Sequence, residues 1–204
     1  IGAQRFYESV GKFGYFEKTG IDLPSEAATI FHKPEAIGPT ELATASFGQR
    51  FKVSVIAQLT AVAAVANGGN LVTPYLVERM IDSDGNTVKE HENTVRGRGG
   101  FEEGVSGDGG AKNARVPGYK IAAKTGTSQK FDVLDANGNS YLRIGSTVAF
   151  APSDESGIAV IIVVDEPTTA VKYGSVVAAP YVAEVMAKAL PYLGYDREGA
   201  DDEI

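Results

Sequence analysis

Hydrophobic residues in the first half of the chain recur at helical spacing in three segments. The segments are residues 1–15, 41–50 and 52–69. The third is apolar on nearly every side and ends at Gly68, so a buried helix with a glycine stop is expected there. Residues 75–90 instead predict two strands, because Asp84-Gly85 is a favoured hairpin turn.

The second half of the chain alternates between strands and turns before a final helix. Strand candidates cover residues 119–127, 141–150 and 158–165. Their connections are too short for helical crossovers, so the strands should be antiparallel neighbours. A helix is expected from about residue 175 to residue 190, with Pro180 near its first turn, where a proline is tolerated or produces a kink.

These elements together predict an α+β fold in which helices flank an antiparallel sheet. Residues 94–117 are rich in glycine and predict a flexible connection. It would join a helical and hairpin part, residues 1–93, to a sheet part, residues 118–193. Residues 194–204 are rich in Asp and Glu and predict a solvated acidic tail or linker.

Composition narrows the functional classes. The chain has 204 residues, of which 43% are hydrophobic and 22% are charged, and this is typical of a globular domain with a real core. Its net charge of −7 argues against an electrostatic nucleic-acid partner. Because the chain has no cysteine and only two histidines, His32 and His91, neither a metal site nor a Ser-His-Asp triad is expected, and nothing indicates a cofactor.

The longest apolar run, residues 158–164, is far short of the roughly 20 residues that span a bilayer. No signal peptide is visible either. Any membrane anchor is therefore expected outside this chain.

One stretch nearly matches a phosphate-binding loop. Residues 118–125, GYKIAAKT, fit G-x-x-x-x-G-K-[ST] except that Ala123 stands where the second glycine belongs. A Cβ there obstructs the turn around a phosphate, and no helical pattern follows to hold the anion. Nucleotide binding is therefore a distant alternative, which an ATP titration would test.

Ser9 and Lys12 form the only S-x-x-K in the chain, the pattern in which penicillin-reactive enzymes carry their nucleophilic serine. Ser9 lies in an ordinary amphipathic pattern, and Gly11 directly before the lysine weakens the helix. A surface position on a helix is therefore the favoured interpretation of Ser9.

Lys-Thr-Gly, another motif of those enzymes, occurs twice. The copy at residues 18–20 lies in a polar stretch with no strand around it, so it predicts only a turn. The copy at residues 124–126 ends an apolar strand and is followed by Thr127 and Ser128. A strand edge presents N–H and C=O groups to an extended peptide, and a lysine with neighbouring hydroxyls adds charge and hydrogen bonds. Only the second copy has that setting.

The order of several segments resembles one protein family. "KTGTSQK" on a strand, then "STVAFAP", "GIAVIIVVDEP" and a terminal helix resemble the class B penicillin-binding proteins, peptidoglycan DD-transpeptidases of the division or sporulation type. "RFYESVGKFGYFEKTGIDLPSE" and "LTAVAAVANGGNLVTPYLV" resemble the segments upstream of that strand. The resemblance covers residues 1–193 and implies the fold that penicillin-binding transpeptidases share with serine β-lactamases. This chain would supply three of its five core strands.

The resemblance implies a reaction on peptidoglycan stem peptides at the extracytoplasmic face of the bacterial membrane. A serine is acylated by a D-Ala-D-Ala terminus, D-alanine leaves, and an amine of a second stem peptide resolves the acyl-enzyme; β-lactams trap the serine. Lys124 would orient the hydroxyl network and add positive charge, and Gly126 would let the substrate lie close to the sheet edge. Thr125 and Thr127 would line the cleft, and the N–H of Thr127 would also donate to the oxyanion hole. Ser128 would be a secondary substrate contact.

The chain also departs from the family pattern. It contains no S-x-N motif, and both this motif and the nucleophilic S-x-x-K are expected upstream of the part that resembles residues 1–15. GRGG at residues 97–100 replaces a helical stretch that is usual in the family, which indicates a shortened or spliced loop. By itself this chain is therefore expected to be inactive.

Two other functions remain as alternatives. One is a non-catalytic, transpeptidase-like module that binds a peptide or a partner protein. The other is a DD-carboxypeptidase or β-lactamase relative, since these enzymes share Lys-Thr-Gly. S-x-x-K and S-x-N in the preceding sequence would favour an enzyme. Sheet edges without neighbours also predict self-association of the chain.

Overall fold

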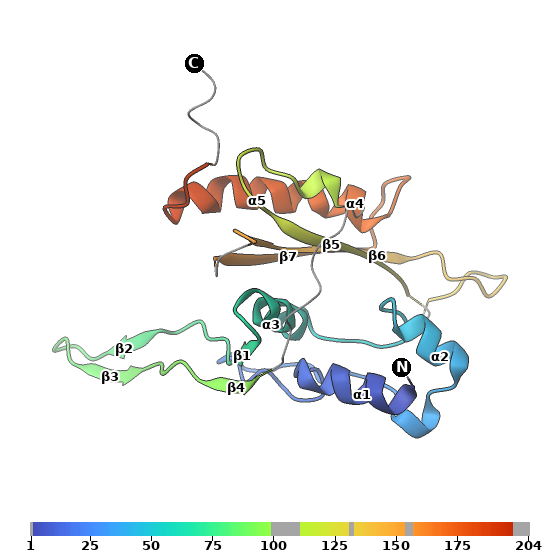
Figure 1. The fold of residues 1–204 in the computed structure, drawn as a ribbon, viewed down its shortest axis with the longest axis horizontal. Helices are drawn as coiled ribbons and strands as arrows, with labels where there is room; N and C mark the ends of the chain where they lie inside the picture. The colour runs from blue at the N-terminus through green and yellow to red at the C-terminus, as the bar shows by residue number, and fades with distance from the viewer. Residues whose placement is uncertain (1, 99–110, 131–132, 154–156, 198–204) are drawn as a thin grey trace, which may run out of the picture. The chain divides into compact units, whose positions relative to one another are not determined.

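The computed structural model describes residues 2–98, 111–130, 133–153 and 157–197. The chain divides into two compact units, Ile1–Glu102 and Glu103–Ile204 (Figure 1). The division falls within the stretch that was predicted to connect two parts, and each unit has its own helices and strands.

The first unit combines helices with two small sheets. Its helices are α1 (Ala3–Lys12), the 3-10 helix η1 (Pro34–Ala36), α2 (Pro39–Ala45) and α3 (Val55–Ala66). Its strands are β1 (Asn70–Val72), β2 (Arg79–Ile81), β3 (Thr87–Glu90) and β4 (Val95–Arg98), paired antiparallel as β1–β4 and β2–β3. The three predicted helices and the predicted hairpin are confirmed, and Gly85 has the positive φ of +86° that the hairpin turn requires.

Aromatic rings connect α1 to the irregular segments that follow it. The rings of Tyr7 and Phe16 are stacked with centroids 4.2 Å apart, and Phe31 lies 5.5 Å from Phe16. Phe51 continues the cluster at 5.2 Å from Phe31. Such pairs contribute roughly 0.5–1.5 kcal/mol each beyond the area that they bury. Side-chain packing therefore stabilises a region that has few backbone hydrogen bonds between strands.

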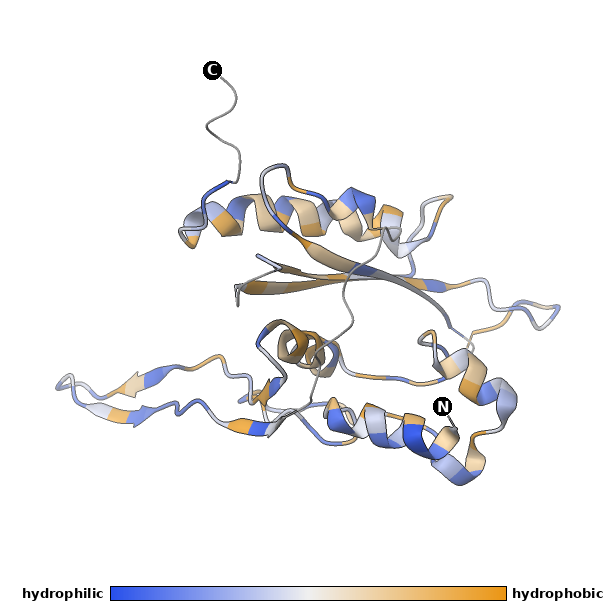
Figure 2. Cartoon of the chain, in the orientation of Figure 1, coloured by the Kyte–Doolittle hydropathy of each residue, from blue (hydrophilic) through white to orange (hydrophobic). Residues whose placement is uncertain are grey.

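Helix α3 is less buried than its sequence predicts. Hydrophobic colour covers most of it in Figure 2. Its buried residues are Ala57, Thr60, Ala61 and Ala64. Val55 is exposed and the remaining residues of the helix are half-buried, so the prediction of a helix buried on nearly every side is wrong. The buried positions recur at a spacing of three or four, which places them on one face of the helix.

The stretch predicted as a flexible connection begins with a strand. β4 pairs with β1, with Gly97 opposite Leu71, and a second 3-10 helix, η2 (Lys112–Ala114), lies near the other end of the stretch. The prediction is therefore wrong for these residues, because β4 depends on a partner more than 20 residues away that is itself only three residues long. Residues 99–110, which include the second half of GRGG, lie outside the described residues.

The second unit is a three-stranded antiparallel sheet with helices on one face (Figure 1). Its strands, in spatial order, are β5 (Ala122–Gln129), β6 (Arg143–Ala151) and β7 (Ile158–Asp165). The core lies between this sheet and the last helix: Val182, Met186 and Leu190 are fully buried in one cluster with residues of β6. Burying each of these side chains contributes roughly 1.5–3 kcal/mol. The predicted antiparallel arrangement of the three strands is confirmed.

The predicted final helix is in fact two helices. α4 (Gly174–Val177) ends one residue before α5 (Ala179–Tyr192) begins, and Ala178 between them has φ −122°. Pro180 lies in the first turn of α5 and has no N–H to continue the hydrogen bonds of α4, so the helix breaks instead of bending. Across the described ranges, no helix has both the length and the apolar character needed to cross a bilayer.

The first residues of the predicted acidic tail pack against the second unit. The N–H of Tyr195 donates to the carbonyl of Leu190 at 3.0 Å, and the hydroxyl of Tyr119 donates to the carbonyl of Tyr195 at 3.0 Å. Tyr195 also contacts the core cluster. The expectation of a solvated tail is therefore wrong at this position, and residues 198–204 lie outside the described residues.

Asp22 fastens the base of the β2–β3 hairpin. Its carboxylate accepts hydrogen bonds from the N–H of Leu76 at 2.7 Å and from the N–H of Val77 at 2.9 Å. These bonds hold the pKa of the Asp22 carboxyl below its ordinary value, and the bond from Val77 has the largest effect. The stability that they contribute is therefore present above the pKa of the unfolded chain and is lost as pH falls through the lower pKa of the folded state.

We expect Asp22→Asn to loosen the hairpin at neutral pH, because an amide offers one acceptor oxygen where the carboxylate offers two. Amide hydrogen exchange at Leu76 and Val77 should accelerate, and the loss of stability between about pH 5 and pH 2 should become shallower than in the wild type. Asp84→Asn is the matched control, because it removes a carboxylate from the same hairpin without touching these two bonds. Unchanged exchange in Asp22→Asn would contradict the role of Asp22.

Candidate active site

The Lys-Thr-Gly copy at residues 18–20 lies in an irregular loop, outside any helix or strand. Thr19 is 1% exposed, and Gly20 has a positive φ of +79°. The N–H groups of Thr19 and Gly20 donate to the carboxylate of Glu26 at 2.9 and 3.3 Å. The carboxylate thus occupies the N–H groups of Thr19 and Gly20. The expectation that no strand surrounds this copy is confirmed, but its three residues form an irregular loop and not a turn.

The copy at residues 124–126 lies on β5, at an edge of the sheet. Its three residues, Lys124, Thr125 and Gly126, pair with Val148, Thr147 and Ser146 of β6. In the part of the chain that the structure describes, no strand pairs with the other edge of β5. An edge of this kind presents backbone N–H and C=O groups to which another extended chain can bind.

Side chains along β5 alternate between the two faces of the sheet. Lys124, Gly126 and Ser128 share one face, and Thr125 and Thr127 share the other. The face of the threonines is the one that α4 covers, since Thr127 Oγ1 accepts a hydrogen bond from the N–H of Gly174 at 3.1 Å. The structure therefore gives Thr127 a contact within the fold, and the contacts of both threonines with a substrate stay predictions.

Lys124 lies on the opposite face and is exposed. Its Nζ donates to the carbonyl of its neighbour Thr125 at 2.7 Å. Ser128, four residues farther along the same face, is half-buried. A cation and a hydroxyl thus lie on one face of the edge strand, roughly 13 Å apart along it.

The first residue of α4 approaches β5 and β6 very closely. A Cβ added to Gly174 would lie 2.2 Å from the carbonyl oxygen of Ser146 and 2.3 Å from that of Gly126. The carbonyl of Gly174 also accepts a hydrogen bond at 3.1 Å from the hydroxyl of Thr147, a fully buried residue. Glycine is therefore required at position 174, where both its N–H and its C=O bind the sheet.

Two glycines of the sheet leave room on its two faces. A Cβ at Gly145 would lie 2.3 Å from Cγ2 of Val177 in α4, and a Cβ at Gly126 would lie 2.7 Å from Oγ of Ser146. Gly126 thus leaves room on the face of Lys124, and Gly145 leaves room on the face of α4.

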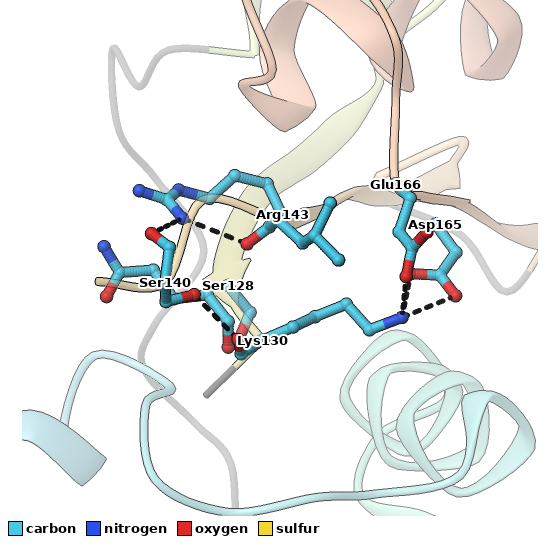
Figure 3. Close-up of polar contacts among 8 residues, drawn as sticks. Ser128, Lys130, Ser140, Arg143, Asp165 and Glu166 are labelled. Carbon is cyan, nitrogen blue, oxygen red and sulfur yellow. Dashed lines mark hydrogen bonds and ion pairs between the residues drawn. The ribbon is translucent and has the colours of Figure 1, made fainter. Parts of the chain in front are cut away.

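A polar cluster follows the end of β5 (Figure 3). Nζ of Lys130 donates to both carboxylate oxygens of Asp165, at 3.0 and 3.1 Å, and to Oε1 of Glu166 at 2.6 Å. These bonds raise the pKa of the Lys130 ammonium above its ordinary value, and the bond to Glu166 has the largest effect. The sequence-based prediction assigned no role to this cluster. A signal was present, because Lys130 lies six residues after Lys124 and an acidic pair ends the strand at 158–165.

The family of the chain follows from a comparison of its sequence with protein-family models. The model described as the penicillin-binding protein transpeptidase domain matches residues 1–187. The chain belongs to this family.

Relatives of this penicillin-binding family include proteins of sporulation and of peptidoglycan synthesis. Stage V sporulation protein D of Bacillus subtilis is 38% identical over 205 residues, which cover 95% of this chain and 31% of that protein. The probable peptidoglycan D,D-transpeptidase PenA of Neisseria meningitidis is 29% identical over 195 residues, which cover 95% of this chain and 33% of that protein. The chain thus spans about a third of the length of these curated relatives.

Solved structures of penicillin-binding proteins share the fold. Penicillin-binding protein 3 of Mycobacterium tuberculosis in complex with ampicillin matches with a TM-score of 0.78 at 21% identity, over 98% of this chain and 48% of that one. A protein of Atopobium parvulum, described as a putative peptidoglycan glycosyltransferase, matches with a TM-score of 0.73 at 25% identity, over 96% and 47%. The predicted fold class is confirmed, and the chain spans about half the length of these structures.

We expect Gly174→Ala to destabilise the second unit by about 3 kcal/mol, which is in the upper part of the usual range for an overpacked position. The reason is that the new Cβ meets backbone atoms, which cannot move aside without moving their strands. Denaturant unfolding followed by circular dichroism would measure the loss. Gly97→Ala is the matched control, because a Cβ at Gly97 has no heavy atom within 4 Å. Equal stability of the two variants would show that the close approach at Gly174 does not constrain the fold.

Proposed function

We propose that this chain is the part of a peptidoglycan DD-transpeptidase domain that carries the Lys-Thr-Gly strand, and that the free edge of β5 binds the donor stem peptide. The observation that carries the proposal is the placement of residues 124–126 on an edge strand, with Lys124 exposed on one face. Membership of the penicillin-binding transpeptidase family supports the class of reaction.

Peptide binding at this edge would combine backbone and charge interactions. An extended stem peptide can add to β5 as a further strand and bond to its free N–H and C=O groups. Its D-Ala-D-Ala end carries a carboxylate, and the ammonium of Lys124 would attract it by roughly 4 kcal/mol before screening, at 4 Å and an effective dielectric constant near 20. The absence of a side chain at Gly126 would let the peptide backbone approach the sheet.

The chemical steps would use a serine that belongs to sequence outside this chain. Its oxygen bonds to the carbonyl carbon of the penultimate D-alanine, the amide C–N bond breaks, and D-alanine leaves with a proton. An amine of a second stem peptide then attacks the ester, forms the new amide and returns the serine. The N–H of Thr127 would donate to the negative charge that develops on the carbonyl oxygen, and Lys124 would orient the hydroxyl of the serine and add positive charge. This reaction would take place at the extracytoplasmic face of the bacterial membrane.

The 204-residue chain by itself should not form a covalent adduct with a penicillin. Ser9, the only serine in an S-x-x-K pattern, is exposed on α1 and its hydroxyl donates to the carbonyl of Arg5 at 2.7 Å, one turn earlier. A fluorescent penicillin followed by denaturing electrophoresis measures the adduct. A stoichiometric band that disappears in Ser9→Ala would identify Ser9 as a nucleophile and contradict the proposal.

In a protein that joins this chain to the rest of its transpeptidase domain, Lys124→Ala should lower the second-order rate of acylation by at least about 100-fold, because the positive charge that orients the hydroxyl network is lost. Lys18→Ala is the matched control: it changes the same motif in the copy that lies in a loop, and it should leave the rate unchanged. Equal effects of the two substitutions would contradict the assignment. Release of acylated product by water alone would instead indicate a carboxypeptidase or β-lactamase, and absence of any adduct would indicate a binding module.

A further inference from the structure

We propose that Lys130, Asp165 and Glu166, which we call the Lys130 clamp, hold the end of β5 against β7 and so position Thr127 and Ser128 for the bound peptide. The link to the peptide rests on the proposed function, whereas the clamp itself rests on geometry alone.

The clamp joins two strands that are not neighbours. Ser128 of β5 lies opposite Ile144 of β6, and Ile144 lies opposite Asp165 of β7. The side chain of Lys130 therefore crosses β6 to reach the acidic pair, as Figure 3 shows. The backbone bonds of the sheet connect β5 only to β6, so this side chain adds a second connection from β5 to the far strand.

Lys130 is held at its backbone as well as at its ammonium. Its N–H donates to the carbonyl of Leu142 at 3.2 Å, and its carbonyl accepts from the hydroxyl of Ser140 at 2.7 Å. Both partners belong to the segment that leads into β6. The residue that follows the edge strand is thus attached to β6 through its backbone and to β7 through its side chain.

The backbone conformation of Glu166 completes the clamp. Consecutive residues of an extended strand point to opposite faces of the sheet, so Asp165 and Glu166 could not both reach one ammonium in that conformation. Glu166 instead has a φ of +51°, and its N–H donates to the carbonyl of Arg143 at 2.9 Å. A positive φ is unfavourable for a residue with a Cβ, and such strained residues persist where the surrounding structure over-determines them.

The exposure of the three side chains favours a positioning role over a stabilising one. The side chain of Lys130 is 19% exposed, whereas those of Asp165 and Glu166 are 61% and 46% exposed. Ion pairs with partners so exposed add little to global stability. A cation held by three hydrogen bonds still restricts where the end of β5 can move. Among the described residues, this end of β5 pairs with a strand on one side only.

Hydrogen exchange in the 204-residue chain tests the clamp without any reference to activity. In Lys130→Met, amides of residues 126–130 should exchange about tenfold faster, whereas amides of α5 should keep their wild-type rates. Lys130→Arg should restore slow exchange, because a guanidinium can also bridge two carboxylates. Lys188→Met is the matched control, because it removes an exposed positive charge from α5 in the same unit.

A second variant guards against a general loss of structure. Glu166→Gln keeps the length of the side chain and should accelerate exchange at the same residues, and its effect should not add to that of Lys130→Met, because both remove the same contact. Unchanged exchange in both variants, additive effects, or an equal acceleration in α5 would each overturn the clamp.

Acylation kinetics test the link to the peptide, in a protein that joins this chain to the rest of its domain. Lys130→Met should raise the penicillin concentration that gives half the maximal rate by about tenfold and change the maximal rate much less, because binding geometry and not the chemical step is altered. An unchanged half-maximal concentration would overturn the positioning role. If the wild-type protein is not acylated at all, the proposed function fails while the exchange result still decides the clamp.

Discussion

The contact between Gly174 and the two strands β5 and β6 determines how the Lys-Thr-Gly strand is held. The backbone of Gly174 donates to Thr127 and accepts from Thr147, so one residue of α4 binds two neighbouring strands through both of its peptide groups. This is possible only because no Cβ separates the helix from the sheet. The arrangement places the hydroxyl of Thr127 on the side of α4 and leaves Lys124 on the opposite face.

The site strand is thus supported from three directions that do not include its free edge. β6 pairs with it along its whole length, α4 binds its middle from one face, and the Lys130 clamp attaches its end from the other face. A strand supported in this way keeps its free backbone groups in place before a peptide arrives, and a partner that needs no rearrangement binds at lower entropic cost. The loop at residues 18–20 has the same three residues but no neighbouring strand, and Glu26 already accepts the N–H groups of Thr19 and Gly20.

Local sequence patterns predicted the features of this fold that depend on residues close together in the sequence. Alternation and short connections predicted the three antiparallel strands, Asp84-Gly85 predicted the hairpin, and a strand setting separated the two Lys-Thr-Gly copies. Features that depend on distant partners were missed. The strand β4 forms because β1 lies beside it, and the Lys130 clamp forms because β7 ends two strands away from β5. The break before α5 was only half predicted: Pro180 marked the position, but a kink and a break differ only in the hydrogen bonds around Ala178.

The three glycines around the site strand have a consequence for the mutations that the protein can accept. At Gly174 any side chain would meet backbone carbonyl oxygens at less than 3 Å, so this position offers almost no tolerated variation. At Gly126 and Gly145 the nearest atoms belong to the side chains of Ser146 and Val177, which would have to shift. Gln129, by contrast, is exposed, and its side chain can change size without disturbing the interior. If a drug occupied the edge of β5, selection for escape would therefore have to act through exposed positions such as Gln129, while Gly174 stayed invariant.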